Sequence, residues 1–556
     1  MTQARIYNQL EVRYCPHTSV SGETMQRVKA GTCTSSGASD GTTLIDTGSG
    51  SGAAKTYNGR YGVLIRSGTC LGQFCRIVGD DGSGTLTLEG NGFSAQIASG
   101  VQYEIMAIPD PCVVVQSSSG ETNMVDSTRS EASNGDAAFW IGYYACVLSG
   151  TYRGKTGLIT GFVPGTGTFT MAAGIGGALS AGDVVVLRKF IEVKGLSLPE
   201  GPAYHPRPQF RSNFAVGDGV LGARAGGCNF NTQVYPSGSL AASASAANPS
   251  VLSGLFQAAG LVETVSTSVT VDTGSTTTAV KITTGTHEKI AVGSMVIWKG
   301  NASFVTSKTD GGASADTITV SPPFPTAPVA TDTLYASRMY AKTTTGDVYG
   351  VLVEAEIDGI TMTMVGCKGN VDRIDGQPPE FAWKFSVDHW WEMYQAAPWN
   401  AGSMFTSATP VLTHERRCYL DATATDVAGF TASPNTAVAP RPVSGALGVN
   451  GRAGFQVTDA SKAGGTFREL SAVGGELVQT NKFLARTAMA FSLVEGTHGT
   501  TFGCRMPVAK IKAYPKPTNA GGLVEFPEVV EAQDAGTASD GTTTPVKMPD
   551  FAFHLS

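Results

Sequence analysis

Residues 61–68 read YGVLIRSG, residues 76–88 read RIVGDDGSGTLTL and residues 101–108 read VQYEIMAI. Each stretch is a short apolar or alternating run bounded by Gly, Asp or Ser, which is typical of β-strands. The turn at Asp80-Asp81-Gly82 divides the second stretch and predicts a hairpin. These residues therefore predict a small all-β unit.

The same order of strands recurs twice along the chain. It returns first in residues 143–150 (YYACVLSG), 157–171 (GLITGFVPGTGTFTM) and 182–189 (GDVVVLRK). It returns again in residues 268–275 (SVTVDTGS), 293–300 (GSMVIWKG), 303–324 and 331–340 (TDTLYASRMY). Repeats of this kind indicate copies of one supersecondary unit. The chain is therefore predicted to contain three related β-modules.

The composition favours a turn-rich, mostly β protein with several domains. A chain of 556 residues exceeds one ordinary core, and it contains 69 Gly and 27 Pro. Charged residues are only 15% of the chain, against roughly 25% in typical globular proteins. Hydrophobic residues are 41%, which excludes a disordered chain.

The charge pattern argues against a protein that reads nucleic-acid sequence. The chain has 39 basic and 45 acidic residues, a net charge of −6, and no long Lys/Arg cluster. The N-terminal MTQARIYNQLEVRY lacks the charged start and apolar core of a signal peptide, and no long apolar run follows. We expect neither a secretion signal nor membrane insertion.

Two stretches raise the alternative of an aspartic protease: Asp46-Thr47-Gly48 and Asp272-Thr273-Gly274. Two carboxylates that share one proton can act as the acid and the base on a single water. Asp, Thr and Gly are also ordinary turn residues. Both stretches are interpreted as following the first strand of a module, and both run into polar sequence. This pattern favours a copied turn over a catalytic pair.

Other candidate motifs also favour structural roles. Trp390 and Trp391 in DHWWEM suggest a sugar platform, but a sheet edge or subunit contact is the favoured interpretation. Asp80 and Asp81 lack the ligand spacing of a calcium loop. Cys70 and Cys75 have no partner pair for zinc, and the ten cysteines are interpreted as buried free thiols. No enzyme is expected, and no catalytic, cofactor-binding or metal-binding residues are assigned.

One helix is predicted before the third module. Asn248 suits the N-cap and Pro249 the first helical position, and Gly260 provides a stop. The apolar residues expected on one face are Val251, Leu252, Leu255 and Phe256.

Residues outside the modules resemble a known family. The stretches are FNTQVYPSGSL (230–240), LFQAAGL (255–261) and residues 360–391, ITMTMVGCKGNVDRIDGQPPEFAWKFSVDHWW. The C-terminal region that starts MPVAKIKAYP (506–515) continues the pattern. Together they resemble the tail tube, or major tail, proteins of long-tailed bacteriophages, with extra small β-modules. The resemblance covers residues 191–263 and 336–556.

The resemblance implies a β-sandwich with one short helix, whose copies form hexameric rings that stack into a tube for DNA. The modules resemble small barrel-like or sandwich domains that decorate phage exteriors. The implied partners are further copies of the chain, other virion tail proteins, DNA that passes without specific binding, and a host surface contacted by the outer modules. The implied location is the virion tail, made in the bacterial cytoplasm.

The expected domains are the first repeat (1–110), the second module (111–190), the first part of the tube-like domain (191–263), the inserted third module (264–339) and the remainder of the tube-like domain (340–556). As exterior decoration, residues 1–185 are expected to be dispensable for assembly. The alternative function is another phage structural protein: a decoration, neck, baseplate or host-surface-binding component.

Overall fold

The computed structural model describes the greater part of the chain. The described residues are 10–16, 25–48, 54, 56–129, 140–199, 204–210, 216–221, 226–235, 251–342, 349–357, 360–376, 378–394, 416–442, 452–458, 462–470, 475–496, 500–520, 523–542 and 545–556. The structure is 54% strand and 5% helix, which confirms the mostly β fold class predicted from the sequence.

The first module is a six-stranded antiparallel sheet. Its spatial order is β2 (Gln26–Thr32), β7 (Gln102–Ala107), β4 (Tyr61–Ile65), β5 (Phe74–Asp80), β6 (Thr85–Leu88) and β3 (Thr43–Ile45). The predicted hairpin is present, because β5 and β6 pair across the Asp81–Gly84 turn. Numbered along the chain, the six strands lie in the order 1-6-3-4-5-2.

The third module has the same strand order. It runs β20 (Val269–Thr270), β25 (Thr333–Ala336), β22 (Met295–Trp298), β23 (Asn301–Thr309), β24 (Asp316–Ser321) and β21 (Ala279–Ile282). The second module pairs its strands in this order too, with β9 (Ser117–Gly120) added. Its strands are β8 (Val113–Val114), β14 (Val184–Ile191), β11 (Tyr144–Val147), β12 (Thr156–Val163), β13 (Thr168–Met171) and β10 (Asn123–Val125).

The similarity of the modules extends to single hydrogen bonds. The Ser67 hydroxyl accepts the Gln102 N–H at 2.8 Å, and the Ser149 hydroxyl accepts the Val184 N–H at 2.8 Å. The register also shifts at the fourth strand of every module, between Ile77 and Gly79, Ile159 and Gly161, and Val305 and Ser307. A bulge at one position in three sheets indicates three copies of one fold.

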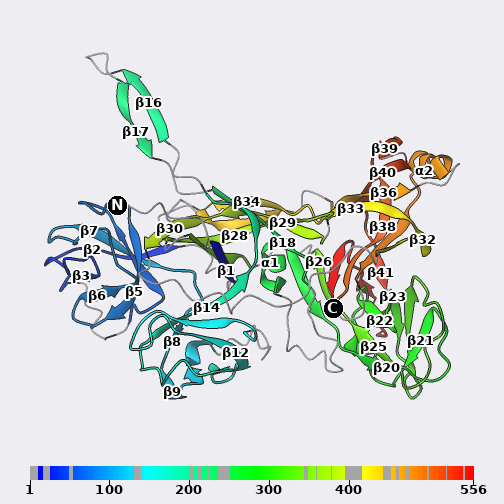
Figure 1. Cartoon of the computed structure of the whole chain (residues 1–556), viewed down its shortest axis with the longest axis horizontal. Helices are drawn as coiled ribbons and strands as arrows, with labels where there is room; N and C mark the ends of the chain where they lie inside the picture. Colours follow the sequence, from blue (N-terminus) through cyan, green and yellow to red (C-terminus); the bar gives the residue numbers. More distant parts are fainter. Residues whose placement is uncertain are drawn as a thin grey trace.

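The modules are inserted between neighbouring strands of a central sheet. Strand β1 (Leu10–Pro16) pairs with β14, with Val12 opposite Ile191, so modules one and two leave and rejoin the sheet at one place. Strands β19 (Leu261–Val265) and β26 (Arg338–Lys342) pair with Val265 opposite Arg338 and enclose module three. Figure 1 shows the first two modules at one end of the molecule and the third at the other.

Strand β1 has a consequence for the expected domains. It lies between β14 and β27 (Val351–Ile357), with Leu10 opposite Ile357 and Pro16 opposite Val351. The range 1–110 therefore joins a strand of the central sheet to the first module, and removal of residues 1–185 would take that strand away. A deletion confined to the modules has to retain residues 10–16.

Strand β28 (Ile360–Ile374) connects the two parts of the central sheet. Its first half pairs with β27 and β30 (His389–Tyr394), and its second half pairs with β29 (Glu380–Val387). Gly366 has a φ of +64° between the two halves, a conformation that favours glycine.

The second part of the central sheet begins at β15 and ends at β19. Its order is β15 (Lys194–Ser197), β18 (Gly226–Gln233), β29, β28, β33 (Val427–Ser433), β36 (Gly464–Leu470), β40 (Leu523–Ala532), β38 (Phe502–Ile511), β43 (Ala552–Leu555), β26 and β19.

Further strands extend this sheet at its C-terminal end or form separate hairpins. Strand β38 also pairs with β37 (Met489–Glu495), which continues to β31 (Arg417–Leu420) and β32 (Thr423–Thr425), and β40 pairs with β39 (Thr518–Ala520). The hairpins are β16 (Tyr204–Phe210) with β17 (Val216–Leu221), β34 (Ala437–Pro442) with β35 (Arg452–Thr458), and β41 (Thr537–Ala538) with β42 (Val546–Lys547).

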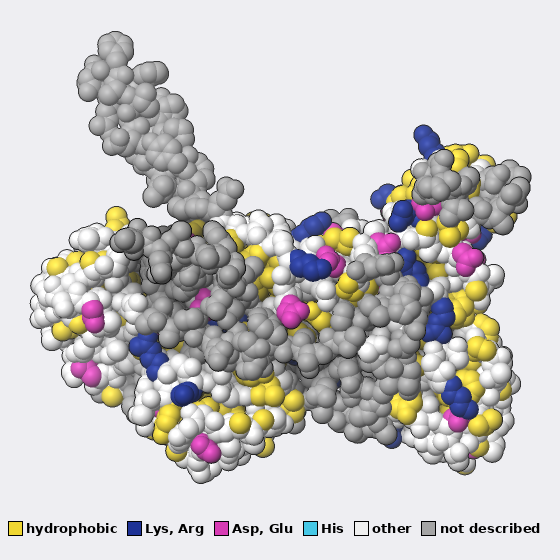
Figure 2. Space-filling view, in the orientation of Figure 1, with side chains coloured by type: hydrophobic (Ala, Val, Ile, Leu, Met, Phe, Trp, Pro, Cys, Tyr) yellow, Lys and Arg dark blue, Asp and Glu magenta, His cyan; other side chains and the backbone are white. Residues whose placement is uncertain are grey.

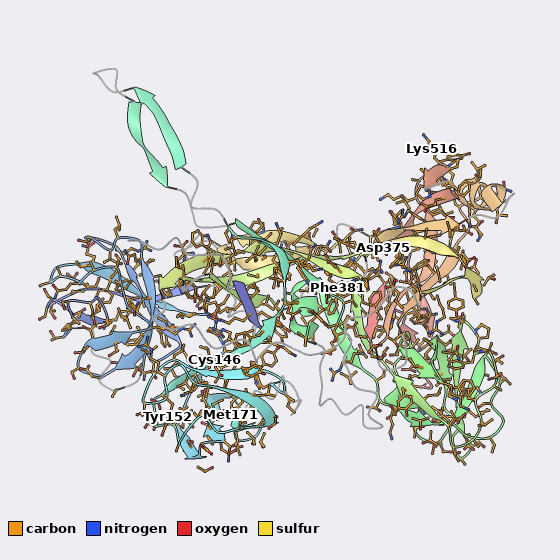
Figure 3. The ribbon with its side chains drawn as sticks, in the orientation of Figure 1. Cys146, Tyr152, Met171, Asp375, Phe381 and Lys516 are labelled. Carbon is orange, nitrogen blue, oxygen red and sulfur yellow. The ribbon has the colours of Figure 1, made fainter. Side chains whose placement is uncertain are left out.

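The central core lies between the two parts of the sheet and around helix α1 (Ser253–Ala258). Leu252, Leu255 and Phe256 are fully buried, and the Phe256 ring stacks on Tyr340 with centroids 4.5 Å apart. Phe381 lies in the same aromatic core (Figure 3). Gly260, at φ +80°, follows the helix as predicted. The predicted start is wrong, because the N-cap is Leu252; residues 248 and 249 lie outside the described part.

The sequence missed a second helix, α2 (Gly475–Leu484), which lies beside β38 near the C-terminal end of the central sheet. Together with β39 it forms a projecting end of the molecule (Figure 1).

Candidate functional site

The two aspartates of the protease alternative lie far apart. Asp46 follows β3 in the first module and Asp272 follows β20 in the third, and these modules lie at opposite ends of the molecule (Figure 1). A shared proton requires two carboxylates within hydrogen-bond distance of each other. This pair therefore cannot act as an acid and base on one water.

The proposed equivalence of Asp46 and Asp272 is wrong. Asp46 follows the second strand of its module, whereas Asp272 follows the first. The counterpart of Asp46 is Asp126, since the Asp46 N–H donates to Gly84 O at 2.9 Å and the Asp126 N–H to Gly167 O at 3.0 Å. A Cβ at either glycine would collide with the aspartate carbonyl. Both stretches read Asp-Thr-Gly, but they form different turns at different positions in their modules. The sequence match therefore does not indicate structural equivalence.

Both DTG aspartates hold turns. The Asp46 carboxylate accepts the Gly48 N–H at 2.9 Å and the Tyr103 hydroxyl at 2.7 Å. Asp272 accepts the Thr273 N–H at 2.6 Å. In the GDDGSG hairpin, Asp81 accepts the N–H groups of Ser83 and Thr85 at 2.8 and 3.0 Å. These carboxylates organise backbone, which is the usual role of Asp in turns.

The tryptophans of DHWWEM are buried inside one chain. Trp390 belongs to the central core, and Trp391 inserts into the core of the first module, where its ring lies 4.8 Å from that of Phe74. Neither indole presents a free face for a sugar to stack on. Trp391 anchors the first module to strand β30.

All ten cysteines are buried, and none forms a disulfide.

One group of potential metal ligands consists of His287, Asp310 and Asp316. Sequence analysis did not find it, because His287 lies 23 or more residues from the two aspartates in the chain. Asp316 already accepts the His287 imidazole at 3.0 Å and the N–H groups of Thr286, His287 and Gly311. These bonds identify Asp316 as the organiser of two loops, which makes the group a poor cation site.

The strongest polar feature is a buried ionic junction where the first module, the second module and the central sheet meet. We define the ionic junction as Arg13, Arg76, Glu89, Asp110, Arg188, Glu354 and Glu356. Arg188 on β14 donates to Asp110 and to Glu354 with both distances 2.7 Å. Arg76 on β5 reaches Asp110 at 2.5 Å, and Arg13 on β1 reaches Glu354 at 2.7 Å.

The junction is buried, and its three arginines face four carboxylates. Every member is at most 6% exposed. Burial opposes ionisation of Asp110, yet Arg188 and Arg76 hold the pKa of its carboxyl well below the usual value. Burial is likewise outweighed at Glu354, where Arg188 and Arg13 lower the pKa to about 2. The charged forms are therefore kept in a site where an unpaired charge would be costly.

The outer carboxylates of the junction respond differently. Burial raises the pKa of Glu89 against the charge of Arg76, 3.1 Å away. Burial also raises the pKa of Glu356, although Arg13 lies 2.9 Å from it. The ionised forms of Asp110 and Glu354 are thus favoured by their arginine partners. At Glu89 and Glu356, desolvation disfavours the ionised form.

A second network closes the C-terminal half of the central sheet. Arg373 on β28 donates twice to Glu495 on β37, each at 2.7 Å, and Arg416 donates to Glu495 at 2.8 Å. Arg416 also contacts Asp375, which lies at the end of β28 (Figure 3). Each network contains pairs that are more than 40 residues apart in the chain, such as Arg13 with Glu354 and Arg373 with Glu495. The networks therefore hold domains and strands in place.

Comparison of the chain with protein-family models gave no match, and comparison with curated proteins gave none either. Among the described helices, neither has the length and hydrophobicity required to cross a bilayer.

Proposed function

We propose that the chain is a virion structural subunit that assembles into stacked rings, sixfold by analogy with the family that its sequence resembles, and forms a phage tail tube. The three modules would decorate its exterior and DNA would pass through its channel. The observation that carries the proposal is that the second part of the central sheet ends in two different strands, β15 and β19, whose outer edges are open. The mildly acidic chain, at −6, also suits a conduit that must not retain phosphates.

The strands at the two ends of this part of the sheet are β15 and β19. Within the described residues, β15 pairs with β18 and β19 pairs with β26, and neither has a second neighbour. On β19, Val262 is 46% exposed and Val265 is 39% exposed. An unprotected edge strand is a template for pairing with another chain. Two different edges that pair head to tail generate a closed ring or a helical polymer.

The buried charges add to this argument. A chain with few charged residues places many of them inside, including Arg13, Arg188, Arg373 and Glu495. Its surface therefore carries even less of the repulsion that keeps monomers apart. The modules leave both edges free, since each is inserted between strands that pair with each other. Such an arrangement suits a subunit that is covered by further copies.

The proposal is tested by charging one edge. Val262→Lys with Val265→Lys places two charges on β19, and we expect self-association of the purified chain to fall sharply in sedimentation velocity. The matched control is Val28→Lys with Val329→Lys, two exposed valines in the modules at 52% and 58%. Equal self-association of both variants would refute the edge contact. A monomer that binds host cells would favour the decoration or host-binding alternative.

A further inference from the structure

Helix α2 presents an unusual outer face. Its inner side carries Gln479, which is buried, and Phe483, which is half-buried. Its outer side carries Val478 at 53% exposure and Leu484 at 68%. A surface helix ordinarily directs charged side chains to water and apolar ones to the core. Two large aliphatic side chains on the solvent side therefore indicate a face that is built to be covered.

The neighbouring strand end extends this apolar face. Tyr514 follows β38, is 52% exposed and makes an edge-to-face contact with Phe483 at 5.8 Å. Exposed tyrosine beside aliphatic side chains is typical of contact surfaces between proteins. Figure 2 shows apolar and basic side chains together on this projecting end, and Figure 3 places Lys516 at its outer limit.

The same end is basic. The α2 tip is defined here as Val478, Lys482, Leu484, Arg486, Tyr514 and Lys516. In the described part of the chain, no carboxylate forms an ion pair with Lys482, Arg486 or Lys516. The tip carries three cations and no carboxylate, a net +3, so the remainder of a chain at −6 carries −9.

We propose that the α2 tip docks on a second copy of this chain, as a contact distinct from the β15 and β19 edges. Charge complementarity favours this partner, because the tip is positive and the rest of each copy is negative. A nucleic acid or an anionic membrane would attract the tip but repel the remaining −9 of the chain. The inference rests on the proposed self-assembly and adds a second interface to it.

The test separates the apolar from the charged contribution. Leu484→Ser with Tyr514→Ser is expected to weaken self-association of the full chain about tenfold or more, since two half-exposed apolar groups lose their burial. Its control, Leu71→Ser with Val163→Ser, removes side chains of 65% and 52% exposure from the modules and should leave association unchanged.

Arg486→Glu with Lys516→Glu should weaken association at low salt and lose this effect at high salt. Arg153→Glu with Lys155→Glu, two exposed cations of the second module, is the matched control. Because all ten native cysteines are buried, Lys516→Cys can carry a photo-crosslinker, and we expect a covalent dimer.

The outcomes distinguish this inference from the proposed function. Loss of association in both the edge and the tip variants supports both interfaces. Loss in the edge variant alone, with no crosslink from position 516, overturns the tip contact and leaves the proposed function standing. A wild-type chain that stays monomeric at high concentration overturns both. Binding of the tip to anionic vesicles without an effect on self-association would also overturn the inference.

Discussion

Arg188→Met is expected to loosen the attachment of the N-terminal modules. Arg188 is fully buried and pairs with both Asp110 and Glu354. Its removal leaves each carboxylate with one guanidinium, Arg76 for Asp110 and Arg13 for Glu354. Breaking a buried ion pair by the removal of one partner costs about 3–5 kcal/mol, so the free energy of unfolding should fall by that amount.

A second substitution distinguishes lost attraction from an uncompensated charge. Arg188→Met with Glu354→Leu also removes one of the two carboxylates that have lost Arg188 and puts an apolar side chain in its place, while Arg13 keeps Glu356 at 2.9 Å. We expect this double variant to be more stable than Arg188→Met alone by at least about 1 kcal/mol, because buried ion pairs are often replaceable by hydrophobic groups.

The assay is urea denaturation followed by tryptophan fluorescence and limited proteolysis. Trp391 reports on the contact between the first module and the central sheet, since its ring lies 4.8 Å from Phe74. The control Arg153→Met changes an exposed arginine of the second module and should stay within about 0.5 kcal/mol of the wild type. If Arg188→Met were equally neutral, the junction would not hold the modules.

Three further predictions concern the central sheet. Burial and the neighbouring Glu469 raise the pKa of Glu528 from 4.5 to about 9. The stability of the wild type should therefore fall as pH rises through that window. In urea melts, Glu528→Gln should be the more stable protein at about pH 8 but not near pH 4.5. Burial and Arg505 lower the pKa of His554 from 6.5 to about 3. The free energy of unfolding should therefore decrease as pH falls below 6.5. In urea melts between about pH 6.5 and 5, His554→Gln should show a weaker dependence on pH than the wild type. Residues 266–337 can be replaced by a two-residue Asn-Gly turn, since Val265 and Arg338 are paired. This variant should stay folded and keep the β-sheet signal of the rest of the chain in circular dichroism, and its aggregation would contradict the insertion.

Local features of the fold could be predicted because their causes are local. The hairpin at Asp81 and the stop at Gly260 depend on residues that lie within a few positions of each other. The repeated strands were visible for the same reason, as short apolar runs with fixed spacing. Strand order could not be obtained in this way, and the match between Asp46 and Asp272 misled because similar letters follow different strands.

Features that depend on residues far apart in the chain could not be predicted from the sequence. The ionic junction joins Arg13 to Glu354, 341 residues away, and no spacing rule connects them. The role of β1 was missed because its partners β14 and β27 lie on the far side of two modules. Helix α2 was missed because Val478 and Leu484 face outward, which removes the amphipathic pattern by which helices are predicted.

The most direct test of the proposed assembly is negative-stain electron microscopy of the purified full-length chain across a range of concentrations. The open edges of β15 and β19 predict rings, and at higher concentration stacked tubes with a central channel and modules on the outside. Particles that remain monomers or discrete trimers at every concentration would contradict it.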